Sequence, residues 1–460
     1  MTSQPCLREH LDTPIVDAYD VVVAGGGASG LIAAVSAARA GARTLLVEHS
    51  GCLGGTATYG MVAQWIGFFN RDTRVVGGLP YELSEHVRRL GGSDGFHRYV
   101  LAEASSNPVP IYNFPFNPEV LKYAADELVQ EAGVALRLHA RVVAPLMADA
   151  GRVGGVVIED IGGRSAVRAG MVIDATGDAT LAAAAGVACA GTEAAQRRER
   201  QPCTLVFRMS NVDVARFRAL PREEKRALAL RGLEEGRIYW ESLSFCSTPD
   251  YTDAIGLMSR IHDVDALDPA DLTRAEVKGR RQIHNIVGFL KERVPGFERA
   301  SLAGIAAHVG VRETRRIVGR HTLTEEEIVG GARHADTIAL GAGPMDLHEA
   351  NGGTGIALWT PEHPFEIPMR CLVPAELGGV LVTGRAISAT RSANGGSRHM
   401  GTAMCLGEAA GVLATELLGQ HSDALPHERV RAVLRSREAL ISVDDALAAD
   451  TPASAFKAAA

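Results

Sequence analysis

The 460-residue sequence predicts an α/β fold that is interrupted by an inserted α+β domain. Three observations predict it. Residues 20–48, DVVVAGGGASGLIAAVSAARAGARTLLVE, place strand-like and helix-like stretches around a glycine-rich turn. Strand-like segments return between 134 and 178, and a last strand and helix come near the far end, at 378–418. We therefore expect one sheet domain whose parts are separated along the chain.

The first strand and turn are the most informative elements. Residues 21–24 are a short β-branched apolar run, which suits a buried parallel strand. Gly25, Gly27 and Gly30 then follow the spacing G-x-G-x-x-G. The first glycine permits a tight turn, the second lets backbone approach a pyrophosphate, and the third lets helix and strand pack closely. Phosphates bound there would lie at the N-terminus of the next helix.

The next helix and strand complete this unit. Residues 31–40 are rich in good helix formers, Gly41 stands where a C-terminal cap belongs, and residues 43–48 predict a second strand. Glu48 ends that strand, where its carboxylate can accept hydrogen bonds from ribose hydroxyls. This order of elements favours a Rossmann-like domain with an adenine dinucleotide. The alternative is a glycine-rich structural turn.

Composition is typical of a soluble enzyme. The net charge of −7, from 47 basic and 54 acidic residues, gives no reason to expect nucleic acid binding. The first 17 residues lack the basic start and apolar core of a signal peptide, and no apolar run reaches about 18 residues, so we expect neither secretion nor a membrane span. The seven cysteines form no C-x-x-C pair or zinc-like spacing, which predicts a cytoplasmic protein without a metal site.

Later segments predict that the sheet domain is split. A helix is expected near 79–90 and a second helix is followed by a strand at about 134–143. Two more strands are expected in GRVGGVVIED and GRSAVRAGMVIDATGD, and the last strand and helix lie in the far segment. The predicted organisation has a first part of the sheet domain, an inserted substrate domain, a return segment, and a C-terminal helix with a tail, at 18–186, 187–375, 376–420 and 421–460.

These motifs carry a family resemblance. The fingerprint, GCLGGTATYGMV, VIDATGD, GVRETRRIVG and GRAISATRSANGGSRHMGTAMCLGEAAGVLA together resemble the FAD-dependent oxidoreductases of the glutathione-reductase-like FAD superfamily. The resemblance spans roughly residues 18–416 and is more distant to succinate dehydrogenase and fumarate reductase flavoproteins. It implies a Rossmann-like FAD-binding domain and FAD as cofactor, but no single substrate.

The resemblance also implies which residues hold FAD. The fingerprint and the second strand would hold the adenosine and pyrophosphate, the loop after Cys52 would pass along the isoalloxazine, and the helix from Gly401 would direct its positive end at the flavin. The implied cofactor-site residues are Gly25, Gly27, Ala28, Ser29, Gly30, Glu48, His49, Gly54, Gly55, Thr56, Val143, Ala175, Thr176, Gly177, Asp178, Gly384, Arg385, Gly401, Thr402 and Ala403.

A pyridine-nucleotide disulfide reductase is disfavoured. Such an enzyme needs a cysteine pair beside the flavin and a second glycine fingerprint, and Cys52 has no partner in its loop. Cys52 is left as a small packed side chain, a flavin tether or a reactive thiol. Tyr59, in the same loop, is interpreted as core packing, with proton transfer as the alternative. Electrons are therefore expected to come directly from an organic substrate.

Four residues are candidates for the substrate side. In an extended segment Arg312 can reach a substrate carboxylate or the flavin, or it can belong to an ion-pair cluster around Glu313. His348 lies in a loop-like stretch and can carry a proton, although a surface role is the simpler interpretation, as it is for His363. Arg398 and His399 stand just before the flavin-facing helix and are favoured as substrate-side residues.

The sequence thus predicts an FAD-dependent dehydrogenase or oxidase that takes a hydride from a small-molecule substrate. The alternatives are an FAD monooxygenase or reductase that uses NAD(P)H, and a flavin-binding sensor without turnover. The electron acceptor and the oligomeric state are left open.

Overall fold

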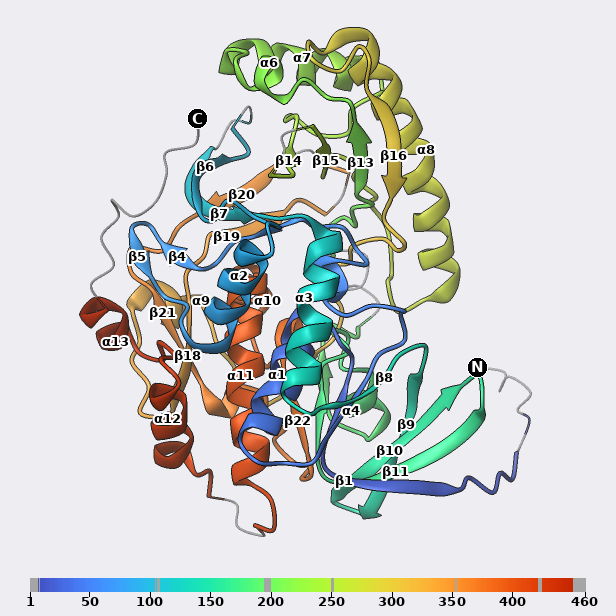
Figure 1. Cartoon of the computed structure of the whole chain (residues 1–460), viewed down its shortest axis with the longest axis vertical. Helices are drawn as coiled ribbons and strands as arrows, with labels where there is room; N and C mark the ends of the chain where they lie inside the picture. Colours follow the sequence, from blue (N-terminus) through green and yellow to red (C-terminus); the bar gives the residue numbers. More distant parts are fainter. Residues whose placement is uncertain are drawn as a thin grey trace.

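Figure 1 shows a computed structural model that describes residues 7, 9–103, 105, 108–193, 200–249, 252–350, 352–353, 355–420 and 424–449. Cys6 and the tail expected after residue 449 lie outside the described residues. The predicted α/β architecture is confirmed, with a largely parallel sheet at its centre. The predicted domain boundaries stay predictions.

The main sheet has the strand order β8-β2-β1-β11-β10-β9, and β22 pairs with β11. The strands β1, β2, β8, β11 and β22 pair in parallel, whereas β9 and β10 form an antiparallel meander with the first half of β11. The sheet is therefore completed by the return segment, as the sequence predicted. Its strands are β1 Ile15–Ala24, β2 Thr44–Val47, β8 Ala135–Arg137, β9 Arg141–Asp149, β10 Arg152–Asp160, β11 Gly163–Asp174 and β22 Val380–Val382.

Strand β1 is buried on both faces where it enters the glycine turn. Val21 and Val23 pack into the core shared with the helices, while Val22 and Ala24 pack against the side that carries the meander. This explains the uninterrupted apolar run in the sequence, because successive side chains of a strand point to opposite faces.

Two helices from opposite ends of the chain lie side by side on the sheet, α1 (Ala28–Arg39) and α11 (Met400–Glu416) (Figure 1). Glycines make their close approach possible. A Cβ on Gly407 would lie 2.1 Å from the carbonyl oxygen of Ser29, and one on Gly411 would lie 2.5 Å from that of Ala33. The return segment is therefore packed directly behind the glycine turn.

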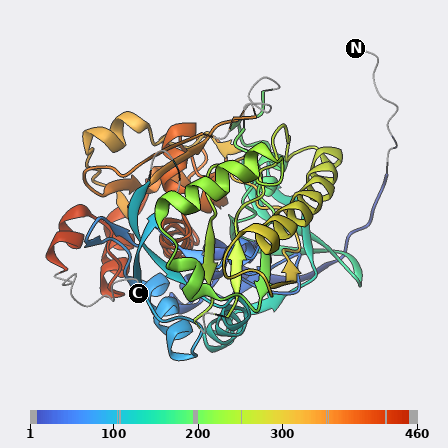
Figure 2. The same ribbon diagram turned by 90° about the horizontal axis from the view of Figure 1, so that it is seen from above.

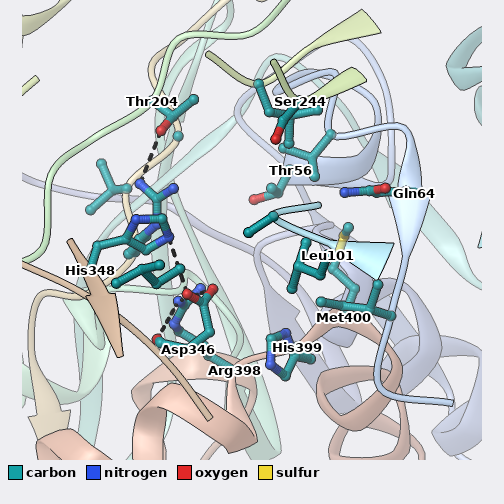
Figure 3. Close-up of a pocket in the computed structure, with 18 of the residues that line it drawn as sticks. Thr56, Gln64, Leu101, Thr204, Ser244, Asp346, His348, Arg398, His399 and Met400 are labelled. Atoms are coloured by element: carbon teal, nitrogen blue, oxygen red, sulfur yellow. Dashed lines mark hydrogen bonds and ion pairs between the residues drawn. The ribbon is translucent and has the colours of Figure 1, made fainter. Parts of the chain in front are cut away.

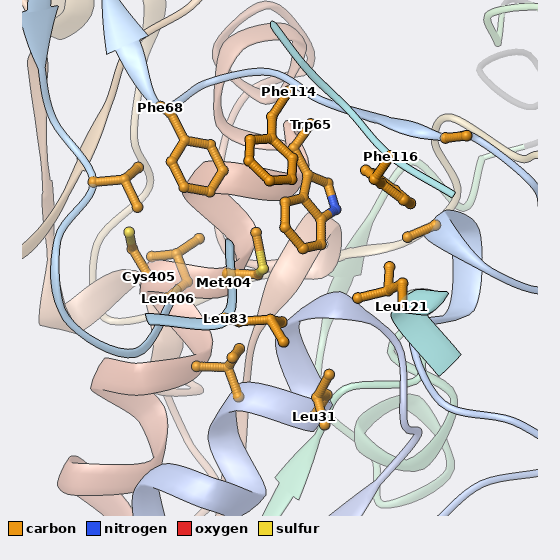
Figure 4. Packing of buried hydrophobic residues seen from close by; sticks show 14 of the residues in the cluster. Leu31, Trp65, Phe68, Leu83, Phe114, Phe116, Leu121, Met404, Cys405 and Leu406 are labelled. Atoms are coloured by element: carbon orange, nitrogen blue, oxygen red, sulfur yellow. The ribbon is translucent and has the colours of Figure 1, made fainter. Parts of the chain in front are cut away.

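The aromatic core sits above these helices (Figure 4). Trp65 is fully buried, and its ring centroid lies 5.4 Å from that of Phe114 and 4.7 Å from that of Phe116. The strands that carry these rings form a separate sheet of order β3-β7-β6, outside the main sheet. It consists of β3 Gln64–Trp65, β6 His97–Leu101 and β7 Val109–Pro115.

A second layer of sheet and helix covers the upper end of the molecule (Figures 1 and 2). Its four-stranded sheet has the order β14-β15-β13-β16. The strands are β13 Phe207–Ser210, β14 Phe245–Ser247, β15 Ala254–Gly256 and β16 Ser301–Ile305, and the helices are α6 Val214–Arg218, α7 Arg222–Glu234 and α8 Pro269–Arg293.

Shorter elements connect these layers. The strands are β4 Phe69–Asn70, β5 Thr73–Arg74, β12 Cys189–Ala190, β17 Arg316–Ile317, β18 Thr337–Gly341, β19 Met345–His348, β20 Ile356–Trp359 and β21 Phe365–Pro368. The helices are α2 Gly78–Arg89, α3 Pro118–Glu131, α4 Thr180–Ala184, α9 Glu325–Gly330, α10 Arg391–Ser397, α12 His427–Ser436 and α13 Val443–Ala448, and the 3-10 turns are η1 Gly55–Ala57, η2 Met369–Leu372 and η3 Gly384–Ala386.

Two sequence-based expectations differ from the structure. The single strand expected at 134–143 is divided into β8 and β9, because His139 adopts a left-handed conformation with φ of +52° between them. The segment around Arg312 is not a strand before β17 begins at Arg316, so the expected alternation of faces does not hold there. Among the described residues no helix has both the length and the apolar character needed to cross a membrane.

Candidate active site

The largest cavity of the site lies between the glycine turn, the end of β2 and the return segment, and its volume is about 560 Å³. Most of the residues expected to hold a dinucleotide line it. They are Gly25, Gly27, Ala28, Ser29, Glu48, His49, Gly55, Thr56, Ala175, Thr176, Gly177, Asp178, Gly384, Arg385 and Ala403.

The glycine turn has the geometry of a phosphate cradle. Gly25 has φ of +101°, a conformation that side chains disfavour. A Cβ on Gly27 would meet no atom within 4 Å, so this backbone faces open space, whereas one on Gly30 would lie 1.9 Å from the carbonyl oxygen of Gly25. The N-terminus of α1 follows, and no side chain caps it. Its free N–H groups therefore face the cavity as an anion site.

Glu48 is held as a carboxylate at the other end of the cavity. It accepts hydrogen bonds from the backbone N–H of Gly26 at 2.6 Å and of Ser50 at 2.8 Å, and its Oε1 lies 2.9 Å from Nδ1 of His49. Burial by itself would raise the pKa of Glu48, but the hydrogen bonds from His49 and the backbone lower that pKa to about 2. Glu48 is therefore ionised and ties the second strand to the turn.

Asp178 organises the wall where β11 meets the return segment. Its Oδ1 accepts a hydrogen bond of 2.6 Å from Thr314 and one of 2.6 Å from Nη2 of Arg385. Arg315 donates to its backbone carbonyl at 3.3 Å. Burial opposes ionisation of Asp178, yet the nearby Arg385 lowers its pKa below the ordinary value.

Five of the expected cofactor residues do not line this cavity. Gly30 serves helix packing, and Gly54 pairs with Gly27 through an isolated β-bridge. On β9 the cavity is lined by Arg141 and Val142, at the start of the strand, and not by Val143. Gly401 packs on the Ile66 to Phe68 segment, and the Thr402 hydroxyl is buried, while Met400 and Ala403 face the cavity.

Two further aromatic residues line this cavity. Tyr59 was interpreted as core packing, with proton transfer as the alternative, and it is half-buried and lines the cavity, with its ring centroid 4.9 Å from that of His308 and 6.0 Å from that of His49. His308 comes from the distant 301–310 stretch, and nothing in its sequence surroundings pointed to the cofactor side. Cys52 lines neither this cavity nor the second one, and its Sγ lies 3.9 Å from Oγ1 of Thr58.

A second cavity of about 230 Å³ adjoins the first (Figure 3). Five residues line both, and they are Thr56, Val311, Arg385, Arg398 and Met400. Its roof is apolar and comes from β6, β14 and β20 with Leu101, Phe245 and Ile356. A small molecule in this cavity would thus lie against whatever group occupies the inner end of the larger one.

Arg312, His348, Arg398 and His399, the four residues predicted for the substrate side, all line this second cavity. The exposed His363 does not line it. Asp346 connects two of them, because its Oδ2 lies 2.8 Å from Nη2 of Arg398 and its Oδ1 lies 3.1 Å from Nε2 of His348. Burial opposes the charge of Asp346, but His348 and Arg398 hold its pKa well below the ordinary value.

Both ring nitrogens of His348 have a charged neighbour. Arg260 donates to Nδ1, which leaves the proton of the neutral ring on Nε2, and Nε2 lies 3.1 Å from Oδ1 of Asp346. Burial and the charge of Arg312 lower the pKa of His348 to about 3, so the ring is neutral at physiological pH. Arg260, which also lies over the ring of Trp240 at 5.4 Å, was not found from the sequence.

Among the residues that the structure describes, His399 makes a hydrogen bond through one ring nitrogen and not through the other. Its Nε2 donates to the backbone carbonyl of Pro344 at 2.7 Å, and its side chain does not cap α11 although it occupies the N-cap position. The proton on Nε2 leaves Nδ1 as the unprotonated atom. Burial and the neighbouring charge of Arg398 lower the pKa of His399 to about 4.

Arg312 is the least neutralised of these cations. One of its Nη atoms donates to the carbonyl of Pro202 and to the Thr204 hydroxyl, and no carboxylate lies within ion-pair distance of it among the residues that the structure describes. Burial lowers the pKa of Arg312 to about 10, which leaves it charged at physiological pH. The alternative cluster around Glu313 is also present, but it is formed by Arg316 at 3.9 Å and Arg391 at 3.2 Å.

Comparison with known proteins agrees with this geometry. A family model described as FAD dependent oxidoreductase matches residues 20–434. The chain belongs to this family. A curated relative, dihydrolipoyl dehydrogenase of Trypanosoma brucei brucei, is 56% identical over 43 residues, a match that spans only 9% of each chain.

Two solved structures are similar to this chain at low identity. A geranylgeranyl bacteriochlorophyll reductase-like protein of Thermoplasma acidophilum matches with a TM-score of 0.52 and 17% identity, over 94% of this chain and 85% of that one. The p-nitrophenol 4-monooxygenase of Pseudomonas putida gives a TM-score of 0.47 and 13% identity over 96% and 92%. The protein is thus an FAD-binding oxidoreductase, and the larger cavity fits the cofactor because its glycine backbone faces open space beside an uncapped helix N-terminus.

Proposed function

We propose that this FAD-dependent oxidoreductase oxidises a small organic anion in the second cavity, where bound FAD supplies flavin N5 as the acceptor of a hydride from the substrate. The observation that supports the proposal is Arg312, a half-buried cation without a carboxylate partner among the described residues, in a cavity that shares five lining residues with the cofactor cavity.

The chain's own residues then divide the work. Arg312 binds the anionic group of the substrate, because a guanidinium holds a carboxylate through charge-assisted hydrogen bonds. The pair of Arg398 and Asp346 orients this wall, since Arg398 also donates to the Asp346 carbonyl at 2.9 Å. The apolar roof excludes water from the reacting atoms.

His399 is proposed to accept the substrate proton at Nδ1. This nitrogen carries no proton in the tautomer fixed by Pro344, and the residue stands at the junction between α10 and α11, next to the lining residues of both cavities. His348 is proposed to be a positioning residue instead, because Arg260 and Asp346 occupy both of its ring nitrogens.

The experiment is anaerobic mixing of the FAD-loaded protein with NADH, NADPH and a panel of small carboxylates and their uncharged analogues, followed by the visible absorption of the flavin. Bleaching by a carboxylate alone, and not by its uncharged analogue, supports the proposal. Bleaching only by NADH or NADPH favours the monooxygenase or reductase, and no bleaching by any compound favours the sensor.

Arg312→Met tests the anion site directly. Loss of a hydrogen bond to a charged group costs about 1.5–3 kcal/mol, which predicts a decrease of roughly 10- to 150-fold in the apparent rate constant for flavin reduction at low substrate concentration. FAD content is expected to stay unchanged, because Arg312 lines only the second cavity. The exposed Arg299 provides the matched control Arg299→Met. An equal effect of both variants would contradict the assignment.

A further inference from the structure

Two histidines and a glutamate converge at a place outside both cavities, around helix α9. Nε2 of His321 lies 2.9 Å from Oε1 of Glu327, and Nε2 of His334 lies 3.9 Å from the same oxygen. All three candidate ligand atoms lie within 4.8 Å of one another. None of these residues lines the cofactor cavity or the substrate cavity.

Both histidine nitrogens in this cluster lack a hydrogen-bond partner. Nε2 of His321 and Nε2 of His334 are buried and unsatisfied among the described residues, and the His334 side chain is only 9% exposed. A buried polar atom without a partner costs about 1–3 kcal/mol, so two such atoms near one carboxylate oxygen call for a common ligand. A cation that accepts both lone pairs and the carboxylate would satisfy all three groups at once.

The capping box of α9 holds the carboxylate of Glu327 through one oxygen and leaves the other oxygen toward the histidines. Its Oε2 accepts the backbone N–H of Thr324 at 2.9 Å, and the Thr324 hydroxyl accepts the backbone N–H of Glu327 at 3.3 Å, which together form the capping box of α9. Oε1 is the oxygen that faces the two histidines. The helix cap thus acts as the outer support that metal-ligating carboxylates require.

The backbone around both histidines is also fixed. The N–H of His334 donates to Oε2 of Glu366 at 2.8 Å. On the other side, Leu323 donates to the Ser388 carbonyl at 3.1 Å and accepts from the N–H of Thr390 at 2.8 Å. The ligands therefore project from a loop that is anchored at both ends, and one anchor is the N-cap residue of α10.

We propose that His321, Glu327 and His334 form a binding site for a divalent transition-metal ion of the zinc class. Two imidazoles and one carboxylate are a ligand set suited to Zn²⁺, whereas Mg²⁺ and Ca²⁺ prefer oxygen ligands throughout. Bond lengths near 2.0–2.1 Å in a tetrahedron place ligand atoms about 3.3 Å apart. The two separations from Glu327 Oε1, 2.9 and 3.9 Å, lie on either side of this value, and all three ligand atoms lie within 4.8 Å of one another.

Three protein ligands leave one coordination position for water or another donor. The sequence interpretation expected no metal site, because the cysteines have no zinc-like spacing, and the three ligands found here stand at the spacing H-x5-E-x6-H. Bound metal would cross-link the loop around α9. This loop is hydrogen-bonded to the segment that leads into α10, and the site residues Arg398 and His399 follow α10. The expected consequence is stabilisation of the folded protein.

The test uses the full-length, FAD-loaded protein without an affinity tag, stripped with chelator and titrated with Zn²⁺ by calorimetry, with metal content measured after dialysis. We expect one equivalent of Zn²⁺ and a higher Tm in its presence. His334→Gln and His321→Gln are each expected to weaken Zn²⁺ binding by at least about 100-fold. The exposed His363→Gln is the matched control and is expected to bind as the parent does.

If a histidine variant does not fold, Glu327→Gln still tests the site. Glutamine can accept the hydrogen bond from the Thr324 N–H, but it does not supply the anionic ligand. Loss of the Zn²⁺ equivalent in Glu327→Gln together with a parental Tm in chelator supports the site. The proposal is overturned if the parent binds no Zn²⁺ at micromolar concentration, or if His334→Gln and Glu327→Gln bind it as tightly as the parent does.

Discussion

Two glycines of the same turn are expected to respond to alanine in opposite ways. Gly27 has φ of −67° and ψ of −175°, which alanine adopts readily, and its added Cβ would meet no protein atom within 4 Å. The added Cβ of Gly30 would lie 1.9 Å from the carbonyl oxygen of Gly25 and 2.9 Å from Cβ of Ala175. One methyl group therefore points into the cofactor cavity, and the other into the protein.

The magnitudes follow from these surroundings. Gly27→Ala is expected to leave the apoprotein as stable as the parent or to stabilise it by about 0.4–1 kcal/mol, since alanine restricts the unfolded chain. It is expected to weaken FAD binding at least about 10-fold, because losing one hydrogen bond between the backbone and the charged pyrophosphate costs about 1.5–3 kcal/mol. Gly30→Ala is expected to destabilise the apoprotein by about 1–3 kcal/mol or more through overpacking.

The assay combines denaturant unfolding of the two apoproteins with FAD titration followed by flavin fluorescence. The reasoning predicts that Gly27→Ala separates cofactor affinity from stability, while Gly30→Ala lowers stability first. Parental FAD affinity in a folded Gly27→Ala protein would refute the assignment of this turn as the phosphate cradle. Equal loss of stability in both apoproteins would refute the packing argument.

Three further predictions concern single side chains. Burial raises the pKa of Glu408 to about 7 from an ordinary 4.5, so the folded state prefers the protonated carboxyl. The free energy of unfolding should therefore decrease by about 3 kcal/mol as the pH rises from 4.5 through 7. Glu408→Gln should accordingly be more stable than the parent at pH 8, but not at pH 4, by thermal unfolding. Trp65→Ala should cost about 3–5 kcal/mol in denaturant unfolding, because it empties the centre of the aromatic core. For His399, the rate of flavin reduction by a substrate should be independent of pH above about 4 and should decrease at lower pH, because the ring then takes up a proton. His399→Gln should retain FAD but lose this decrease at low pH. An unchanged pH profile in the variant would exclude His399 as the proton acceptor.

The strand, the glycine turn and the helix that form the cofactor turn could be predicted from the sequence. A buried parallel strand needs consecutive apolar residues, and a tight turn against phosphates needs glycines at fixed spacing, so Val21 to Glu48 carry their structure in their order. The split of the 134–143 stretch at His139 was not predictable, because nothing around it signals a left-handed residue.

The substrate side depended on contacts between distant segments. Arg312, His348, Arg398 and His399 were chosen from the sequence, and the fold brings all four to one cavity. The sequence favoured Arg398 and His399 and gave His348 a surface role as its simpler interpretation, whereas the fold places His348 in the cavity with Arg260 and Asp346 beside its ring nitrogens.

By itself the sequence determined the glycine turn and the strand and helix around it, since these depend on residues that are neighbours in the chain. The fold class followed from the order of such local elements, and the choice of FAD followed from a family resemblance whose motifs are spread over residues 18–416. Only the tertiary structure decided that Arg312 lacks a carboxylate partner among the described residues, that His399 keeps one nitrogen free, and that two histidines meet Glu327 beside α9. Charge pairing, burial and ligand geometry arise between segments far apart in sequence, and one-dimensional spacing does not encode them.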